Sequence, residues 1–219
     1  MRIDIWSDVV CPWCYVGKRR FERALEAMNE GSTPGREAIQ IVHRSFQLDP
    51  ARPKGQTQKR REMLMAKYRL SAEQVAAMDL QMEQTAATEG LEYHLDDGVT
   101  GNTFDAHRLL HLAGERGVQD AAVERFFRAY FTERRSLFDD ASLTALAVEA
   151  GLDGSEVGDV LGSDRYAQAV AADTREAHAL GANGVPFFMI DHRFGVSGAQ
   201  ATDVFAQVLA RARESRAAL

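Results

Sequence analysis

The sequence predicts an α/β protein in which the two ends of the chain build one small domain and a large all-helical domain is inserted between them. Three observations predict it: short alternating segments near the start, similar segments near the end, and a middle with repeated helical stripes. We expect the discontinuous domain to comprise residues 1–56 and 182–219, and the inserted helical domain residues 57–181. A chain of 219 residues is long enough to bury a sizeable core.

The N-terminal region predicts a strand, a helix and a second strand. Residues 2–7 alternate between apolar and polar side chains, which is typical of a short strand. A helix is expected from Pro12, because proline loses nothing at a first helical position. Its apolar stripe consists of Phe21, Ala24, Leu25 and Met28. Residues 31–35 predict a loop and residues 39–46 the second strand.

The middle of the chain predicts about five or six helices. Ser71 and Gln74 have the spacing of a capping box at a helix start. The strongest apolar stripe is formed by Val123, Phe126, Phe127, Tyr130 and Phe131. We expect the methionines at 63, 78 and 82 to fill the core rather than to line a peptide groove.

The C-terminal region returns to strands and a helix. The apolar run 187–190 and residues 194–197 predict a hairpin that turns at residues 191–193, and Gly198 is expected to open the last helix. Pro186 would lose a hydrogen bond inside a central strand, so it should sit at a strand's first position or at an edge. From the residues alone the bond before it is expected to be trans, as about 95% of such bonds are.

The composition excludes several classes of protein. With 26 basic and 32 acidic residues the net charge is −6, which argues against broad electrostatic binding of nucleic acid. The longest segment without charged residues, 177–190, is too short to span a bilayer. Asp4 and Asp8 interrupt the apolar start, so we expect no secretory signal, no membrane partner and a cytoplasmic protein. The sequence does not define an oligomeric state.

The chain has two cysteines, and both lie in one tetrapeptide, Cys11-Pro12-Trp13-Cys14. A disulfide between Cys11 and Cys14 would close a very small ring and stabilise the fold by only about 2 kcal/mol. The pair is therefore expected to take part in a reaction rather than to stabilise the fold. Cys11 would lie at a helix N-terminus, where the helix dipole favours the nucleophilic thiolate. Cys14 falls on the inward stripe of the same helix. We therefore expect Cys11 to form the mixed disulfide and Cys14 to resolve it.

Four segments of the chain resemble the FrnE-like branch of the DsbA family of thiol–disulfide oxidoreductases. They are residues 7–17, 102–110, 184–188 and 196–200. The resemblance implies a thioredoxin-like fold with an inserted helical domain, dithiol–disulfide exchange at Cys11 and Cys14, and a cis bond before Pro186. It implies a protein or a small molecule carrying a thiol or disulfide as the substrate and no bound cofactor, with glutathione as a candidate co-substrate. The direction of redox turnover stays open.

Several residues are candidates for substrate binding. Pro12, Trp13, Val185 and Pro186 would shape the edge where a substrate docks, and Trp13 would also cover the sulfurs. Gln200 lies in a region that contacts glutathione in glutathione-binding members of the superfamily. His107 is expected mainly to border the core, with substrate contact as the less favoured reading. The basic run 18–20 is expected to be a solvated face, and the alternative is that it holds an anionic partner such as glutathione near Cys11.

Two other functions stay open at this point. The first is a glutathione-dependent isomerase or transferase that acts on a small apolar, polyketide- or chromene-like substrate beneath the helical insert. The second is a zinc module in which Cys11 and Cys14 join His107 and His111. The spacing of these four residues is not that of a compact zinc site, so we expect no metal.

Overall fold

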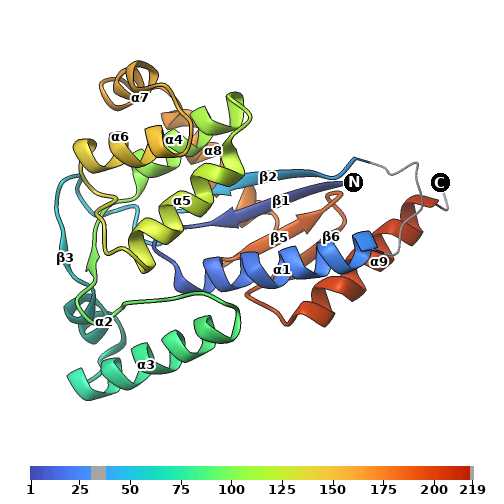
Figure 1. Ribbon diagram of the computed structural model, residues 1–219, viewed down its shortest axis with the longest axis horizontal. Helices are drawn as coiled ribbons and strands as arrows, with labels where there is room; N and C mark the ends of the chain where they lie inside the picture. Colours follow the sequence, from blue (N-terminus) through green and yellow to red (C-terminus); the bar gives the residue numbers. More distant parts are fainter. Residues whose placement is uncertain (31–37, 218–219) are drawn as a thin grey trace.

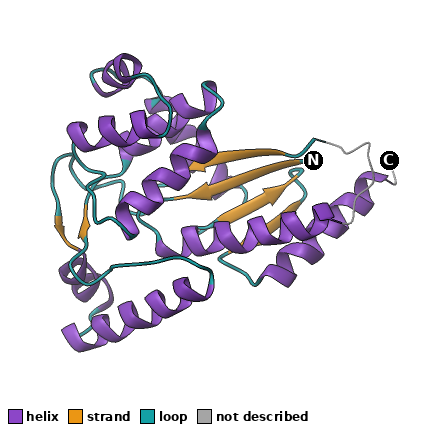
Figure 2. Ribbon diagram, viewed as in Figure 1, coloured by secondary structure: helices purple, strands orange, loops and turns teal. Residues whose placement is uncertain are grey.

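The computed structural model describes residues 1–30 and 38–217. In this part of the chain, a sheet and two long helices built from both chain ends lie beside a larger group of helices (Figure 1). Coloured by secondary structure, the strands of the main sheet lie together near the middle of the molecule, a short pair of strands lies at its left edge, and helices surround them (Figure 2). The loop predicted at residues 31–35 lies outside the described residues.

The main sheet has four strands in the order β2-β1-β5-β6. They are β1 (Arg2–Ser7), β2 (Gln40–Ser45), β5 (Phe187–Ile190) and β6 (Phe194–Ser197). β1 runs parallel to β2 and antiparallel to β5, and β5 and β6 form the predicted hairpin. Parallel neighbours need a crossover connection, which α1 (Pro12–Glu30) supplies.

Both faces of the sheet are buried, because each is covered by helices. In the β1–β5 register Ile5 lies opposite Phe188, and their shared face packs against α1 and α9 (Thr202–Ala217). On the other face Trp6 packs with Phe187 beneath α8 (Ala167–Ala179). The alternation predicted for the first strand is correct, but it separates two buried faces instead of a buried face from a solvated one.

The inserted region contains seven helices rather than five or six. Besides α8 they are α2 (Arg60–Tyr68), α3 (Ala72–Thr88), α4 (Phe104–Glu115), α5 (Gln119–Phe131), α6 (Asp140–Glu149) and α7 (Gly154–Leu161). The shortest, α2 and α7, span too few turns for a clear periodic signal. One antiparallel pair of two-residue strands, β3 (Gln58–Lys59) and β4 (Val99–Thr100), lies among them. Within the described residues, every helix is too short or too polar to span a bilayer.

Local sequence signals identify α3 and α5 correctly. The Ser71–Gln74 capping box begins α3, and the predicted stripe of α5 is buried at every position. These helices share one hydrophobic core with the first turns of α1. The N-terminal end of α1 is therefore packed among the inserted helices. The boundaries expected at 56/57 and 181/182 stay a prediction.

The last helix begins later than predicted. Gly198 has a φ of 81°, which lies outside the right-handed helical region, and α9 starts at Thr202. The intervening residues form a turn in which the amide of Gln200 donates to the Gly198 carbonyl oxygen.

Candidate active site

The two cysteines lie where β1 ends and α1 begins. Cys11 directly precedes α1, and its carbonyl oxygen accepts a hydrogen bond from the amide of Cys14 at 3.0 Å. The amide of Cys11 donates to the carbonyl oxygen of Asp8 at 2.9 Å. These bonds hold Cys11 at the positive end of the helix dipole, as the sequence predicts. The first turn of α1 carries no acidic residue that would oppose an anion there.

Cys11 forms part of a cavity wall although it is only 5% exposed. Both cysteines are free thiols. The Cys11 Sγ donates a long hydrogen bond to the carbonyl oxygen of Val185 at 3.7 Å. An incoming sulfur must therefore approach Cys11 through the cavity and beside Val185.

Cys14 is enclosed in the core one turn behind Cys11. Its side chain is 2% exposed, and among the described residues that line the cavity Cys11 is present and Cys14 is not. Burial is the main cause that raises the pKa of the Cys14 thiol well above its ordinary value, and the neighbouring Cys11 thiol raises it further. Cys14 is thus a neutral thiol at neutral pH, and it must lose a proton before it can attack a disulfide.

Pro186 packs directly against α1, and the bond between Val185 and Pro186 is cis. The cis bond implied by the family resemblance is therefore confirmed, and the trans bond expected from the general frequency of X-Pro bonds is wrong. A Cβ atom at Gly17 would lie 3.0 Å from Cγ of Pro186 and 3.4 Å from Cα of Ala199. Gly17 thus permits this close approach, which brings Val185 to Cys11.

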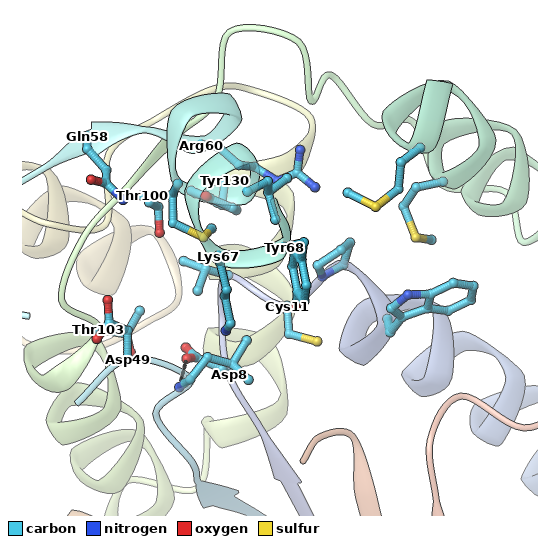
Figure 3. A pocket seen from close by; sticks show the side chains of 18 of the residues that line it. Asp8, Cys11, Asp49, Gln58, Arg60, Lys67, Tyr68, Thr100, Thr103 and Tyr130 are labelled. Carbon is cyan, nitrogen blue, oxygen red and sulfur yellow. Dashed lines mark hydrogen bonds between the residues drawn. The ribbon is translucent and has the colours of Figure 1, made fainter. Parts of the chain in front are cut away.

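A cavity of about 1140 Å³ opens beside Cys11 (Figure 3). Helices α2 and α3 form its outer wall, and the active-site turn of α1 forms its base. Apolar and aromatic side chains supply much of the lining, including Trp13, Leu48, Met63, Tyr68, Met78 and Met82. Trp13, Leu48 and Tyr68 are also among the large hydrophobic side chains that remain exposed. Met82 is buried in the core as expected and also borders the cavity, whereas Met63 and Met78 are only partly buried and line it, so the expectation that they fill the core is wrong for these two.

Polar groups are interspersed among the apolar ones. Figure 3 shows Lys67 extending down the cavity toward Asp8, with Arg60, Thr100 and Tyr130 around its upper part. The Arg60 guanidinium is itself paired with the buried carboxylate of Asp79. The cavity can therefore accept a ligand that has an apolar body and a polar or anionic end.

Asp8 and His107 form a buried pair beside the thiols. Each side chain is 1% exposed, and His107 Nε2 lies 3.4 Å from Asp8 Oδ1. Asp8 Oδ2 accepts a hydrogen bond from the amide of Leu48 at 2.7 Å. Within the described residues, Asp8 Oδ1 and both ring nitrogens of His107 have no hydrogen-bond partner. His111, one turn further along α4, contacts Asp173 and Ser45 instead.

The structure brings some predicted site residues together and separates others. Pro12, Trp13 and Val185 line the cavity with Cys11. Gln200 is exposed and donates to the carbonyl oxygen of Ser197, and neither it nor the buried His107 is among the described cavity-lining residues. Their roles in substrate binding stay predictions.

The basic run 18–20 is not the solvated face that we expected. The ammonium of Lys18 is buried and pairs with Glu22 and with Asp120 and Glu124 of α5, while Arg20 pairs with the buried Glu89 after α3. These ion pairs tie α1 to the inserted helices.

Sequence reasoning missed most of the cavity wall. Asp8 has a detectable signal, because it lies in the segment around the cysteines. No sequence signal marks four other residues of the cavity wall, because only the packing of distant segments brings them near Cys11. They are Lys67, Tyr68, Thr100 and Tyr130. Among the described residues, no group of three or more possible metal-ligating side chains comes together.

The chain belongs to the family described as the DSBA-like thioredoxin domain, whose model matches residues 2–210. It therefore has the DsbA-like thioredoxin fold and is a member of a thiol–disulfide oxidoreductase family, as the sequence motifs imply. The assignment to the FrnE-like branch stays a prediction.

Solved structures support membership of the DSBA-like thioredoxin domain family. A probable DsbA oxidoreductase from Streptomyces coelicolor is 52% identical, with a TM-score of 0.91 over 98% of this chain and 90% of that one. The cytosolic disulfide reductase DsbM from Pseudomonas aeruginosa is 19% identical, with a TM-score of 0.66 over 97% and 99% of the two chains, and it is also known with GSH. A 2-hydroxychromene-2-carboxylate isomerase is 15% identical, with a TM-score of 0.67 over 99% and 98%. The last two likenesses concern the fold alone.

Proposed function

We propose that this protein exchanges its Cys11/Cys14 dithiol with disulfides that enter the cavity beside Cys11. The observation that carries the proposal is the difference between the two sulfurs. Cys11 lies at the cavity wall and at the start of α1, whereas Cys14 is enclosed one turn behind it. The accessible sulfur is suited to form a mixed disulfide, and the enclosed sulfur is suited to resolve it.

In the reducing direction the reaction has two steps. The Cys11 thiolate attacks one sulfur of the substrate, the substrate S–S bond breaks, and the first substrate thiolate leaves. The Cys14 thiol then loses its proton and attacks Cys11 Sγ, which forms the Cys11–Cys14 disulfide and releases the second thiolate. The two released thiolates gain the two protons that the enzyme dithiol gave up. The same two steps in the reverse order oxidise a substrate dithiol and reduce the Cys11–Cys14 disulfide. We propose glutathione as the thiol co-substrate, a proposal that the GSH-bound DsbM structure supports.

The cavity supports a preference among disulfides. Cys11 is 5% exposed, and Trp13, Met63 and Tyr68 stand along the route to it. A small disulfide or an extended peptide could reach the sulfur, whereas a disulfide on the rigid surface of a folded protein would meet the cavity rim first. We propose that Pro12, Trp13 and Val185 contact the bound substrate, and that Pro186 positions Val185.

Two cysteine variants test the proposal with an aromatic disulfide that releases a coloured thiolate. The Cys11→Ser protein should release no thiolate above the buffer rate. The Cys14→Ser protein should release one equivalent and then hold the other half of the probe on Cys11, as intact-mass measurement would show. Thiolate release by Cys11→Ser at the wild-type rate would end the proposal.

The cavity also favours a second candidate, a glutathione-dependent isomerase or transferase that acts on a small apolar molecule. Its mostly apolar wall and its volume fit such a substrate. This reaction would not need a resolving sulfur. Turnover of an apolar electrophile with glutathione that survives Cys14→Ser would support the second candidate, and turnover lost with Cys14 would support dithiol exchange.

A further inference from the structure

Helix α2 presents a regular row of side chains to the cavity. Arg60, Met63, Leu64 and Lys67 all contribute to the cavity wall, and the spacing i, i+3, i+4 and i+7 places them on one face of the helix. The two cations stand at the ends of this row, and the two apolar side chains stand between them. Seven residues of helix separate the cations by about 10 Å along the axis. The reaction described so far gives neither cation a role.

The ammonium group of Lys67 is available to a ligand. Lys67 is exposed, and it extends down the cavity toward Asp8, at the end of the cavity where Cys11 lies (Figure 3). Within the described residues Lys67 forms no ion pair, and its ammonium lies 5.7 Å from the centroid of the Tyr68 ring. A cation without a carboxylate partner on the wall of a largely apolar cavity favours a ligand that brings its own negative charge.

The Arg60 guanidinium is fixed in place at the other end of the row. Its side chain is 8% exposed, and its Nη1 donates to the buried carboxylate of Asp79 on α3. Among the described residues this is the one hydrogen bond that the guanidinium makes, although a guanidinium carries five N–H donors. The Thr100 hydroxyl lies in the same part of the wall. Donors therefore remain for a ligand, on a group that is already oriented.

The other charged groups of the described cavity wall are paired or buried. Asp49 and Arg52 form an ion pair with each other at 3.0 Å. The Asp8 carboxylate is 1% exposed and lies 3.4 Å from His107. Lys67 is therefore the charged group of this wall that a ligand can neutralise without first breaking an ion pair.

We propose that the cavity selects small disulfides that carry carboxylates on an apolar body, with Lys67 binding a carboxylate near Cys11 and Arg60 binding one at the far end. Met63 and Leu64 would contact the apolar body between them. The inference rests on the proposed function, because it names the substrate class of that reaction. The covalent step is unchanged: the Cys11 thiolate attacks one sulfur, the substrate S–S bond breaks, and the other half leaves as a thiolate.

Three aliphatic disulfides of similar length test the charge preference. Dithiodipropionate carries carboxylates, dithiodiethanol hydroxyls and cystamine amines. The rate of mixed-disulfide formation at Cys11 is measured by intact mass in a Cys14→Ser background, where the adduct persists. Dividing each rate by the rate of the same disulfide with the urea-unfolded protein removes differences in intrinsic reactivity. We expect dithiodipropionate to be preferred over dithiodiethanol by about tenfold, and over cystamine by more.

Variants of Lys67 should change this preference in a set order. Lys67→Gln should bring the ratio of acidic to neutral disulfide close to one, and Lys67→Glu should make cystamine the fastest of the three. The neutral disulfide reports any general change in the Cys11 thiolate. The matched controls are Lys59→Gln and Lys59→Glu, because Lys59 directly precedes α2, is exposed and is not among the described cavity-lining residues. Both controls should keep the preference of the parent protein.

The Arg60 end of the cavity is tested with a longer aromatic acid, dithiobis(nitrobenzoate). Arg60→Lys keeps a cation for Asp79 but removes the fork of donors. It should slow the aromatic acid about threefold and leave dithiodiethanol unchanged. Equal slowing of both disulfides would overturn the role of Arg60.

Oxidised glutathione separates the proposed class from an acidic disulfide with a polar body. After the same correction for intrinsic reactivity, we expect dithiobis(nitrobenzoate) to react faster than oxidised glutathione, because Met63 and Leu64 contact an apolar body. The opposite order would overturn the apolar part of the inference.

The result that would overturn the inference as a whole is one ranking of the three aliphatic disulfides shared by the parent, Lys67→Gln and Lys67→Glu proteins. An equal change of ranking in the Lys59 variants would overturn it too, since the effect would then come from net charge. Failure of the parent protein to form a mixed disulfide with any of the probes would instead overturn the proposed function.

Discussion

Replacing Gly17 with alanine tests whether the contact between α1 and the loop before β5 is as close as the structure indicates. A Cβ atom at position 17 would lie 3.0 Å from Cγ of Pro186 and 3.4 Å from Cα of Ala199. Attractive contacts between carbon atoms lie at about 3.5–4.0 Å, so the new methyl group overlaps a rigid ring and a backbone atom. Such overpacking costs about 1–3 kcal/mol.

Alanine also has a better helix propensity than glycine, by about 1 kcal/mol. We therefore expect Gly17→Ala to lower the free energy of unfolding by about 0–2 kcal/mol. Gly158, inside α7, is the matched control, because a Cβ there would meet nothing within 4 Å. Gly158→Ala should raise the free energy of unfolding by up to about 1 kcal/mol.

Urea unfolding of the reduced proteins measures both changes from the midpoint and slope of each transition. The decisive quantity is the difference between the two variants, which we expect to be about 1–3 kcal/mol. Gly17→Ala should also slow exchange with a model disulfide, since displacing Pro186 displaces Val185 from Cys11. If Gly17→Ala stabilised the protein as much as Gly158→Ala does, the reasoning about this contact would be refuted.

Two further predictions concern stability. Tyr93→Phe removes the 2.8 Å hydrogen bond to the carbonyl oxygen of Pro12 and should lower the free energy of unfolding by about 1–2 kcal/mol; an unchanged urea midpoint would contradict it. Burial alone would raise the pKa of Asp4, but hydrogen bonds from Arg2 and Arg44 hold it below its ordinary value. The unfolded state therefore binds the proton more tightly, so this contribution to stability is complete above about pH 4 and is lost as the pH falls further. Asp4→Asn should be less stable at neutral pH and lose less on acidification, and an unfolding free energy measured against pH with the wild-type slope would count against this assignment.

Much of the fold could be predicted because its signals are local. The alternation in residues 2–7, the proline at the start of α1 and the capping box at Ser71 each report on a few neighbouring residues. The same is true of the cysteine pair, whose helix position follows from its own segment. The start of α9 does not follow from its own segment, because the turn after β6 sets the left-handed conformation of Gly198.

The cavity and its polar groups could not be predicted, because they depend on contacts between distant segments. Met63 and Met78 have the same local pattern whether they fill a core or border a cavity, and only the packing of α2 against α3 decides between these. Lys18 appears in the sequence as part of a charged run, and it is buried because α5 brings carboxylates to it. His107 meets Asp8 only once α4 packs against β2 and thereby lies beside the turn that follows β1.

The most direct test of the central claim is competitive alkylation of the reduced native protein, with each cysteine followed by peptide mass spectrometry. If Cys11 is the accessible sulfur and Cys14 the enclosed one, a small alkylating reagent should modify Cys11 at least about tenfold faster, and Cys14 should become reactive only in urea. Equal rates at the two positions, or faster modification of Cys14, would contradict the assignment of their roles.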